Sequence, residues 1–227
     1  MAGPPLPDAI ASALVADVED LVEALRVPEG EPAGALVLFH GRGTSEQDLA
    51  PLLDVFDPRG RLVGAFPRGP LQLPPIGHHW YAVEDGVPDP GTFRATFERL
   101  GPWLARLAER TGVPIERTVL GGFSQGAVMA WALGLGPGRP RPAGILAMSG
   151  ALPVVAGFDL RLDGLAGLPV AITHGTQDPI IPIELGRDAR DRARAAGADV
   201  VYRETEVPHI VDPRVVPGLV TWLEARY

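Results

Sequence analysis

The sequence Gly122-Phe123-Ser124-Gln125-Gly126 places a serine between two glycines, a pattern typical of a nucleophile presented on a sharp turn. An apolar run that suits a buried strand precedes the turn, and small helix-forming residues follow it. Such an elbow strains the serine backbone and exposes Oγ, and the N-terminus of the following helix favours a developing oxyanion. The alternative is an ordinary strand-to-helix turn with a buried serine. We predict that Ser124 is a catalytic nucleophile.

A serine hydroxyl needs a base, which near neutral pH is a histidine oriented by a carboxylate. When the serine lies on an elbow of this kind, the acid and then the histidine follow it along the chain. His174 and His209 are the only histidines after Ser124. His209 lies between the last predicted strand and the last predicted helix, and Asp178 follows a buried strand in a Gly-Thr-Gln-Asp-Pro turn. The order predicts a triad of Ser124, Asp178 and His209.

Each member of this set has a simpler explanation when taken alone. Asp178 suits a turn before a proline, and His209 suits a solvated loop. Asp212 is a rival acid three residues after His209, although the N-cap of a helix explains it equally well. Ser149-Gly150 ends another predicted strand but lacks the elbow pattern, so Ser149 is not predicted as a nucleophile.

An oxyanion hole requires two N–H donors aimed at one point. The first is predicted to be the backbone N–H of Gln125, and the second the backbone N–H of Arg42, in a glycine-rich loop after another apolar strand. His40 precedes that loop and has no second ligand at metal spacing. We therefore interpret His40 as a structural hydrogen-bonding residue and predict no metal site.

The segment 67–90 is long and rich in proline and glycine, and loops of this length in compact domains are often functional. It contains Trp80 and Tyr81, which we predict to line the substrate pocket. A cover over the hydrophobic core is an equally good explanation of both aromatic residues.

Alternating strands and helices predict an α/β fold with a mostly parallel central sheet and helices on both faces. Because ligands bind beyond the carboxyl ends of such strands, the predicted site residues can meet there. Residues 21–27 are predicted as an edge strand, with the continuation of a helix at 9–19 as the alternative. Ser45 and Asp48 fit a capping box that opens a helix through 52–53. Further strands are predicted at 35–39, 61–66, 144–148, 169–173 and 199–204, and further helices at 92–111, 184–196 and 212–226.

Composition excludes several classes of protein. The chain has 227 residues and a net charge of −8, which argues against nucleic acid as a partner. It contains neither lysine nor cysteine, which excludes Schiff-base chemistry, disulfides and thiolate sites. We expect a flexible tail at 1–8, a single domain at 9–227, no signal peptide, no stable membrane insertion and a cytoplasmic location.

Several segments together resemble one known family. They are Phe39-His40-Gly41-Arg42-Gly43, the Ser124 elbow, His174-Gly175-Thr176-Gln177-Asp178-Pro179-Ile180-Ile181-Pro182, and His209-Ile210 before a closing helix. The combination resembles the phospholipase/carboxylesterase family of α/β-hydrolases, which includes the acyl-protein thioesterases, over about residues 33–226. Pro208 departs from the glycine that many members have before the base. Arg42 resembles bacterial esterase-like members more than thioesterases with leucine there.

The resemblance implies an α/β-hydrolase fold, the triad and donors named above, no cofactor, and hydrolysis of carboxylic esters and thioesters. As partner we expect a small-molecule ester substrate. It also allows a homodimer, because family members are often dimers. We expect a serine carboxylesterase for small to medium acyl esters. The alternatives are an acyl-protein thioesterase or lysophospholipase with the same triad and a non-catalytic binding protein. A dienelactone-hydrolase-like enzyme is less favoured, because enzymes of that kind usually resemble one another in having a cysteine at the site, and this chain has no cysteine.

Overall fold

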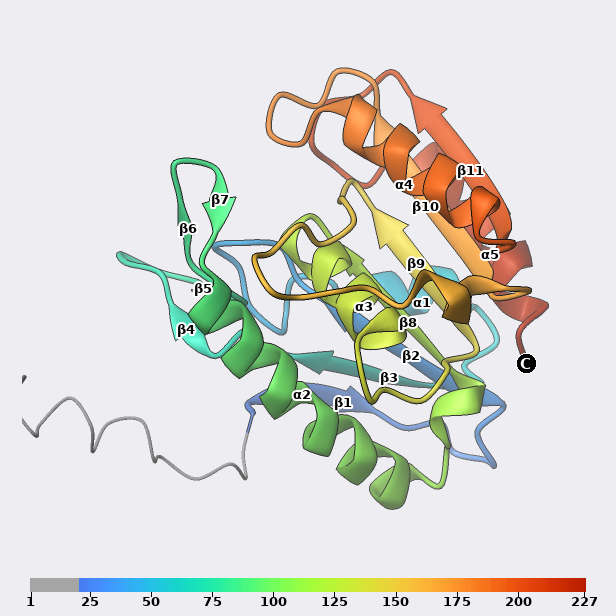
Figure 1. Ribbon diagram of the computed structural model, residues 1–227. Coiled ribbons are helices and arrows are strands. Elements are labelled where there is room, and N and C mark those ends of the chain that lie inside the picture. The colour runs from blue at the N-terminus through green and yellow to red at the C-terminus, as the bar shows by residue number, and fades with distance from the viewer. Residues whose placement is uncertain (1–20) are drawn as a thin grey trace, which may run out of the picture.

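Continuous apolar segments form the centre of a seven-stranded sheet in the computed structural model, which describes residues 21–227 (Figure 1). All neighbouring strands are parallel except the first, which pairs antiparallel with β3 at the sheet edge. The edge strand predicted at 21–27 is thus confirmed. In spatial order the strands are β1 (Glu23–Arg26), β3 (Leu62–Pro67), β2 (Gly34–Phe39), β8 (Thr118–Phe123), β9 (Gly144–Met148), β10 (Pro169–Gly175) and β11 (Asp199–Thr205).

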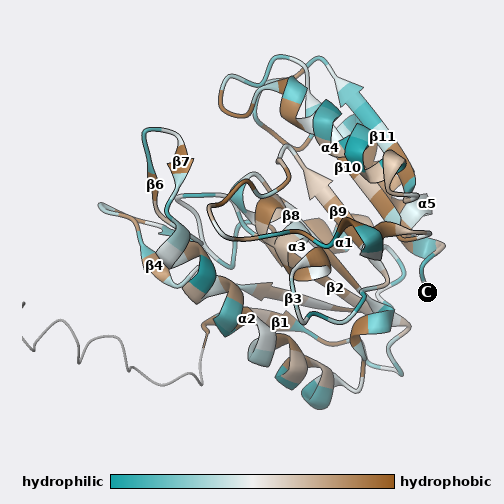
Figure 2. Cartoon of the chain, viewed as in Figure 1, coloured by the Kyte–Doolittle hydropathy of each residue, from teal (hydrophilic) through white to brown (hydrophobic). Residues whose placement is uncertain are grey.

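Helices cover both faces of this sheet, as the alternating elements predict. Successive strand residues point to opposite faces. Val37 and Phe39 accordingly belong to the core beneath α2 (Pro90–Thr111), α3 (Gln125–Leu135) and α4 (Ile183–Ala195). Leu36 and Leu38 belong to the core beneath α1 (Leu52–Phe56) and α5 (Val216–Glu224). The strands between these layers are largely hydrophobic, whereas the outer faces of α2 and α4 are polar (Figure 2).

The long segment between β3 and α2 holds two small hairpins. One consists of β4 (Leu71–Gln72) and β5 (His78–His79), and the other of β6 (Val83–Glu84) and β7 (Val87–Pro88). The β6–β7 hairpin projects from the body of the molecule (Figure 1). Asp89 then caps α2 by accepting a hydrogen bond from the Thr92 N–H at 2.8 Å.

The strand order reverses between β2 and β8. The chain leaves β2 toward β3 on one side and later returns to β8 on the other. A sheet of this kind opens a crevice outside the carboxyl ends of the two strands at such a switch point. Those two ends carry the His40–Arg42 loop and the Ser124 turn.

Three predicted boundaries need correction. The helix expected to open at Ser45 begins only at Leu52, after a turn in which the Asp48 N–H donates to the Ser45 carbonyl. β10 continues through Gly175, so the predicted strand end at 173 is wrong. The last helix is divided into a 3₁₀ turn, Pro213–Val215, and α5. The predictions for the tail at 1–8 and the helix at 9–19 lie outside the described residues.

Candidate active site

Ser124 lies between β8 and α3 with φ 56° and ψ −121°, a conformation that residues with a side chain rarely adopt. Two glycines allow it. A Cβ at Gly122 would lie 2.4 Å from the Gly126 carbonyl, and a Cβ at Gly126 would lie 1.9 Å from the Phe39 carbonyl oxygen. The Ser124 N–H donates to the Met148 carbonyl of β9 at 2.9 Å. Steric contacts and sheet hydrogen bonds therefore impose the strained turn.

The loop after β2 lies against this turn. A Cβ at Gly41 would lie 3.7 Å from the Ser124 Cβ and 3.2 Å from the Phe123 ring. Among the described residues, no carbonyl accepts a hydrogen bond from the backbone N–H of Arg42 or of Gln125. Gln125 opens α3, and the first N–H groups of a helix have no partner within it. Both predicted oxyanion donors are thus unused beside Ser124.

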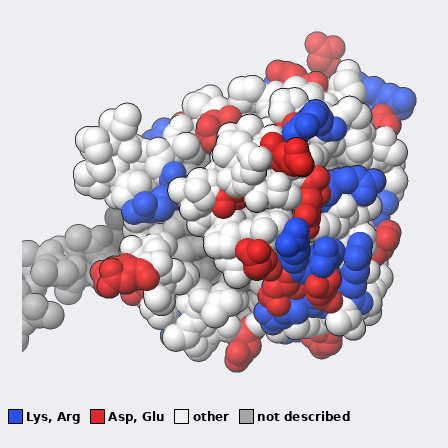
Figure 3. All heavy atoms as spheres, turned by 90° about the horizontal axis from the view of Figure 1, so that it is seen from above, with Lys and Arg blue, Asp and Glu red and all other residues white. Residues whose placement is uncertain are grey.

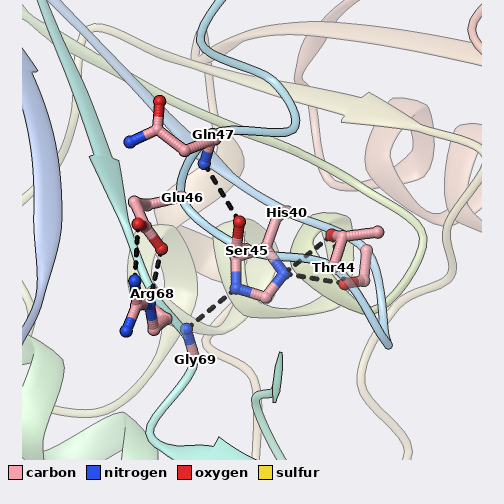
Figure 4. A network of polar contacts seen from close by, with 8 residues as sticks. His40, Thr44, Ser45, Glu46, Gln47, Arg68 and Gly69 are labelled. Carbon is pink, nitrogen blue, oxygen red and sulfur yellow. Dashed lines mark hydrogen bonds and ion pairs between the residues drawn. The ribbon is translucent and has the colours of Figure 1, made fainter. Parts of the chain in front are cut away.

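His40 fixes the start of the loop. Its Nδ1 lies 2.7 Å from the Gly41 carbonyl oxygen, and its Nε2 lies 2.9 Å from the Gly69 N–H nitrogen (Figure 4). Because a carbonyl only accepts and an N–H only donates, the proton is assigned to Nδ1 and the lone pair to Nε2. Burial lowers the pKa of His40, which favours this neutral form. His40 is therefore a structural hydrogen-bonding residue.

Glu46 and Arg68 form a second anchor for the same loop. Arg68 donates to both Glu46 carboxylate oxygens, at 2.5 and 2.6 Å (Figure 4). The Glu46 side chain is buried, and the Arg68 hydrogen bonds lower its pKa to about 2. This ion pair joins the loop after β2 to the end of β3. It also explains why no helix begins at Ser45 as the predicted capping box requires. The segment after Ser45 is fixed by this tertiary contact and not by helical hydrogen bonds.

Asp178 and His209 come from the loops after β10 and β11. His209 Nδ1 lies 2.6 Å from Asp178 Oδ2, while Asp178 Oδ1 accepts the N–H groups of Ile180 and Ile181, both at 2.9 Å. Burial disfavours the charged carboxylate, but the hydrogen bonds from His209 and the backbone outweigh it, and the pKa of Asp178 lies below its usual value. The carboxylate thus stays ionised and keeps its place beside the imidazole.

The imidazole of His209 in turn lies next to the elbow. Its ring packs on the ring of Phe123, the residue before Ser124, with centroids 4.6 Å apart. The described residues include no hydrogen bond between His209 and the Ser124 hydroxyl. In enzymes without substrate this contact is often long, and it tightens when substrate binds. The structure therefore joins Asp178 to His209 by a hydrogen bond and places the His209 ring against Phe123, the residue before Ser124.

The rival residues have other partners. Asp212 accepts the Arg214 N–H at 2.9 Å and pairs with the Arg214 guanidinium, so it caps the following turn. His174 is completely buried, with Nε2 2.9 Å from the Ile181 carbonyl oxygen and 3.6 Å from Asp178 Oδ2. His174 thus fixes the Asp178 loop through its contact with the Ile181 carbonyl oxygen. This role of His174 was not predicted from the sequence, although His174 lies only four residues before Asp178.

Trp80 and Tyr81 occupy different environments. The Trp80 side chain is completely buried and donates from Nε1 to the His40 carbonyl at 2.8 Å. It is not among the residues that line the cleft at Ser124, so the core-covering alternative describes it better than the pocket prediction. Tyr81 does line that cleft. The Gln125 side chain joins both residues to the elbow by accepting the Trp80 N–H and donating to the Tyr81 carbonyl, both at 2.8 Å.

The cleft at Ser124 has a volume of about 470 Å³ and a mostly apolar lining. Its walls come from segments far apart in the chain: the β6–β7 hairpin, the loop after β9, the loop after β10, and the first turn of α4. Apart from the predicted site residues Arg42, Tyr81, Ser124 and Gln125, its lining residues were not predicted, because only the tertiary fold brings them together. They are Arg42, Tyr81, Val83, Gly86, Pro88, Ser124, Gln125, Val128, Ala151, Leu152, Val154, Ile180, Ile181 and Leu185.

Residues 21–227 lack both a metal-binding cluster and a membrane-spanning helix. No group of three or more histidine, aspartate or glutamate side chains is arranged to hold a metal ion in this part of the chain. Within the same residues, no helix combines the length and the apolar character needed to cross a bilayer.

Several proteins that are similar to this chain in sequence carry the name acyl-protein thioesterase 1. Those of Candida albicans and Mycosarcoma maydis are 28% and 27% identical over 198 and 221 residues, covering 78% and 86% of this chain and 84% and 91% of theirs. The acyl-protein thioesterase 1 of Schizosaccharomyces pombe is 40% identical over only 72 residues, which are 31% of this chain and 32% of that protein. This chain therefore matches only about a third of the length of the Schizosaccharomyces pombe protein.

Solved structures show the same fold. The Bacillus cereus carboxylesterase superposes with a TM-score of 0.79 at 21% identity and covers 92% of this chain and 96% of its own. Zea mays acyl-protein thioesterase 2 superposes with a TM-score of 0.69 at 19% identity and covers 91% and 99%. The predicted α/β-hydrolase fold is confirmed.

A family model described as Phospholipase/Carboxylesterase matches residues 22–225, nearly all of the described chain. The match includes the elbow, the loop after β2 and the loops that carry Asp178 and His209. The chain belongs to the phospholipase/carboxylesterase family.

Proposed function

We propose that the protein is a serine hydrolase for carboxylic esters, with Ser124 as nucleophile, His209 as base and Asp178 as the residue that orients the base. The observation that carries the proposal is the 2.6 Å contact between His209 Nδ1 and Asp178 Oδ2 beside the strained turn of Ser124. A carboxylate on Nδ1 fixes the proton there and leaves Nε2 free to accept the serine proton.

The first half of the reaction forms an acyl-enzyme. Ser124 Oγ bonds to the ester carbonyl carbon as its proton passes to His209 Nε2, and the carbonyl electrons become an oxyanion. The backbone N–H groups of Arg42 and Gln125 donate to that oxyanion. When the carbonyl re-forms, the bond to the alcohol breaks and His209 returns its proton to the leaving oxygen. In the second half, a water molecule attacks the acyl carbon as its proton passes to His209. The bond to Ser124 Oγ then breaks, the carboxylic acid leaves, and His209 returns the proton to Ser124.

The expected substrates are esters with small to medium acyl groups. A cleft of about 470 Å³ with an apolar lining suits an acyl chain. Its walls at Val83, Val128 and Leu152 offer hydrocarbon contact and few hydrogen-bonding groups. This lining supports an ester with an apolar acyl part over a highly polar substrate such as a sugar.

A second candidate is a thioesterase or lysophospholipase that acts on longer acyl chains with the same residues. The names of the relatives from Candida albicans and Mycosarcoma maydis favour it. A series of p-nitrophenyl esters from acetate to palmitate, together with matched thioesters, separates the two. A maximum of kcat/KM at four to eight carbons supports the first candidate, and a maximum at sixteen supports the second.

The proposal is tested by covalent labelling with a fluorophosphonate probe alongside hydrolysis of p-nitrophenyl butyrate. Ser124→Ala should abolish labelling and lower kcat by at least about a thousandfold while circular dichroism stays unchanged. His209→Ala should lower kcat to a similar degree.

Ser149→Ala is the matched control. Ser149 is also a buried serine at a strand end with positive φ, 48°, and its replacement should leave labelling and turnover intact. Absence of labelling in the unmodified protein would favour a binding protein with an unused hydrolase fold. Equal labelling of Ser124→Ala would assign the nucleophile to another residue.

A further inference from the structure

The wall of the cleft at Ser124 carries a positive charge. Of the described residues that line it, Arg42 alone carries a formal charge, and the others are apolar or neutral. Arg42 is exposed and follows Gly41, which packs against Ser124. The guanidinium therefore belongs to the residue whose backbone N–H is the second proposed oxyanion donor, in the same cleft as Ser124.

This guanidinium has no acidic partner in residues 21–227. Arg68 is paired with Glu46, but among the described residues Arg42 has neither a hydrogen-bond partner nor an ion-pair partner. The carboxylates of Glu84 and Asp85 on the β6–β7 hairpin also form no ion pair with it. In a chain of net charge −8 with many paired arginines, a cation left unpaired at a cleft is available to a ligand.

The surroundings of Arg42 favour such a ligand. Burial lowers the pKa of His79, and the positive charge of Arg42 lowers it further, so the neighbouring imidazole remains neutral near pH 7. Charged side chains are densest on the side of the molecule that carries α4 and β11 and sparser on the opposite side (Figure 3). Glu84 and Asp85 are the acidic residues of the β6–β7 hairpin, and neither lines the cleft.

We propose that the Arg42 side chain selects esters that carry an anionic group close to the scissile carbonyl. The inference rests on the proposed esterase function and names its substrate class. Arg42 would supply its backbone N–H to the oxyanion and its guanidinium to a carboxylate or phosphate, which it can bind with two parallel hydrogen bonds. The apolar walls would hold the hydrocarbon part of the same substrate.

The anion can belong to the acyl part or to the alcohol part, and two substrate pairs distinguish these sources. Mono-p-nitrophenyl glutarate and p-nitrophenyl valerate differ by a carboxylate on the acyl chain. Butyryl glycerol 3-phosphate and monobutyrin differ by a phosphate on the alcohol. For each pair the measured quantity is the ratio of kcat/KM for the anionic ester to that for the neutral one.

We expect this ratio to exceed one for at least one pair and to fall about tenfold in Arg42→Gln. Arg42→Lys, which keeps the charge but loses the planar pair of donors, should fall between the two. The ratio in the unmodified protein should also decline as NaCl is raised, a readout that needs no variant. Arg203→Gln removes an exposed positive charge from β11, away from the cleft, and should leave the ratio unchanged.

The possible failures are distinguishable. If esters are hydrolysed in a Ser124-dependent way but both ratios stay near one, or do not change in Arg42→Gln, the selection by Arg42 is refuted and the esterase function stands. If no ester is hydrolysed and no probe labels Ser124, the proposed function and this inference fail together.

Discussion

The floor of the cleft and its rim are built in opposite ways. The floor consists of the elbow, the loop after β2 and the buried Asp178 carboxylate, which are held by strand pairing, glycine contacts and hydrogen bonds. The rim consists of a projecting hairpin and loops whose apolar side chains face solvent. Val154 is 77% exposed and Ile180 64% exposed, whereas Ser124 is 8% exposed.

This difference separates two tasks. Acyl transfer needs the nucleophile, base and oxyanion donors fixed to within a fraction of an ångström, which only a packed scaffold provides. Substrate choice depends on surface contacts that can change without disturbing the fold. Substitutions in the floor should therefore affect folding and turnover, whereas substitutions in the rim should affect mainly which ester is preferred.

The largest effect is expected for Gly126→Ala. The added Cβ would lie 1.9 Å from the Phe39 carbonyl oxygen and 2.6 Å from that of His40. Both atoms belong to the backbone and cannot rotate away, so α3 must shift from β2 and separate the two proposed oxyanion donors. We expect a loss of at least about 3 kcal/mol in the free energy of unfolding, measured in urea, and a fall in kcat of more than about a hundredfold.

Gly218→Ala is the control for this substitution. Gly218 lies in α5, where an added Cβ meets no atom within 4 Å. Alanine is the better helix former, so the variant should gain about 0.5–1 kcal/mol with unchanged kcat. If Gly126→Ala were as stable and active as Gly218→Ala, the elbow would not be the rigid element that the comparison requires.

The floor was also easier to predict from sequence than the rim. Apolar runs such as 35–39 and 144–148 indicate strands buried on both faces. Ser124, Asp178 and His209 each follow a predicted strand, and they occur in the chain order expected for the nucleophile, the acid and the base. These signals are local or depend only on chain order. They suffice to predict the parallel sheet and to propose the three side chains.

The features that could not be predicted from the sequence depend on contacts between distant segments of the chain. Ser45 and Asp48 have the residue types of a helix cap, but the pairing of Glu46 with Arg68, 22 residues later, holds that segment as a loop. Trp80 and Tyr81 are adjacent aromatic residues, and no sequence pattern says which one faces the cleft. The four rim segments come from separate parts of the chain, so their meeting cannot be predicted from composition or periodicity.

The second prediction concerns the anchor of the floor, the Glu46–Arg68 pair. The pKa of Glu46 is about 2 in the folded protein and near its ordinary value of 4.5 when unfolded. A lowered carboxyl pKa stabilises the fold above pH 4.5, and this contribution is lost as the pH falls toward 2. Glu46→Gln should reduce stability by about 1–2 kcal/mol at pH 7, a value limited by solvent screening of the part-exposed Arg68.

The pH dependence provides the check. The difference in unfolding free energy between the two proteins should narrow from pH 7 to pH 3. Asp54→Asn, which breaks the exposed pair with Arg26, should change stability little at any of these pH values. A difference that stays constant with pH would mean that Glu46 acts by packing and not through its charge.

The smallest effect is expected at the rim, for Val154→Ser. Val154 lines the cleft and is mostly exposed, so its methyl groups gain burial only when an acyl chain lies against them. We expect unchanged stability and unchanged kcat/KM for p-nitrophenyl acetate, but a loss of about two- to fivefold for the octanoate, mainly through KM. Val55→Ser, at an exposed valine of α1 that does not line the cleft, should alter neither ester. An equal loss for acetate and octanoate would place Val154 in the floor and remove the division of tasks between the two regions.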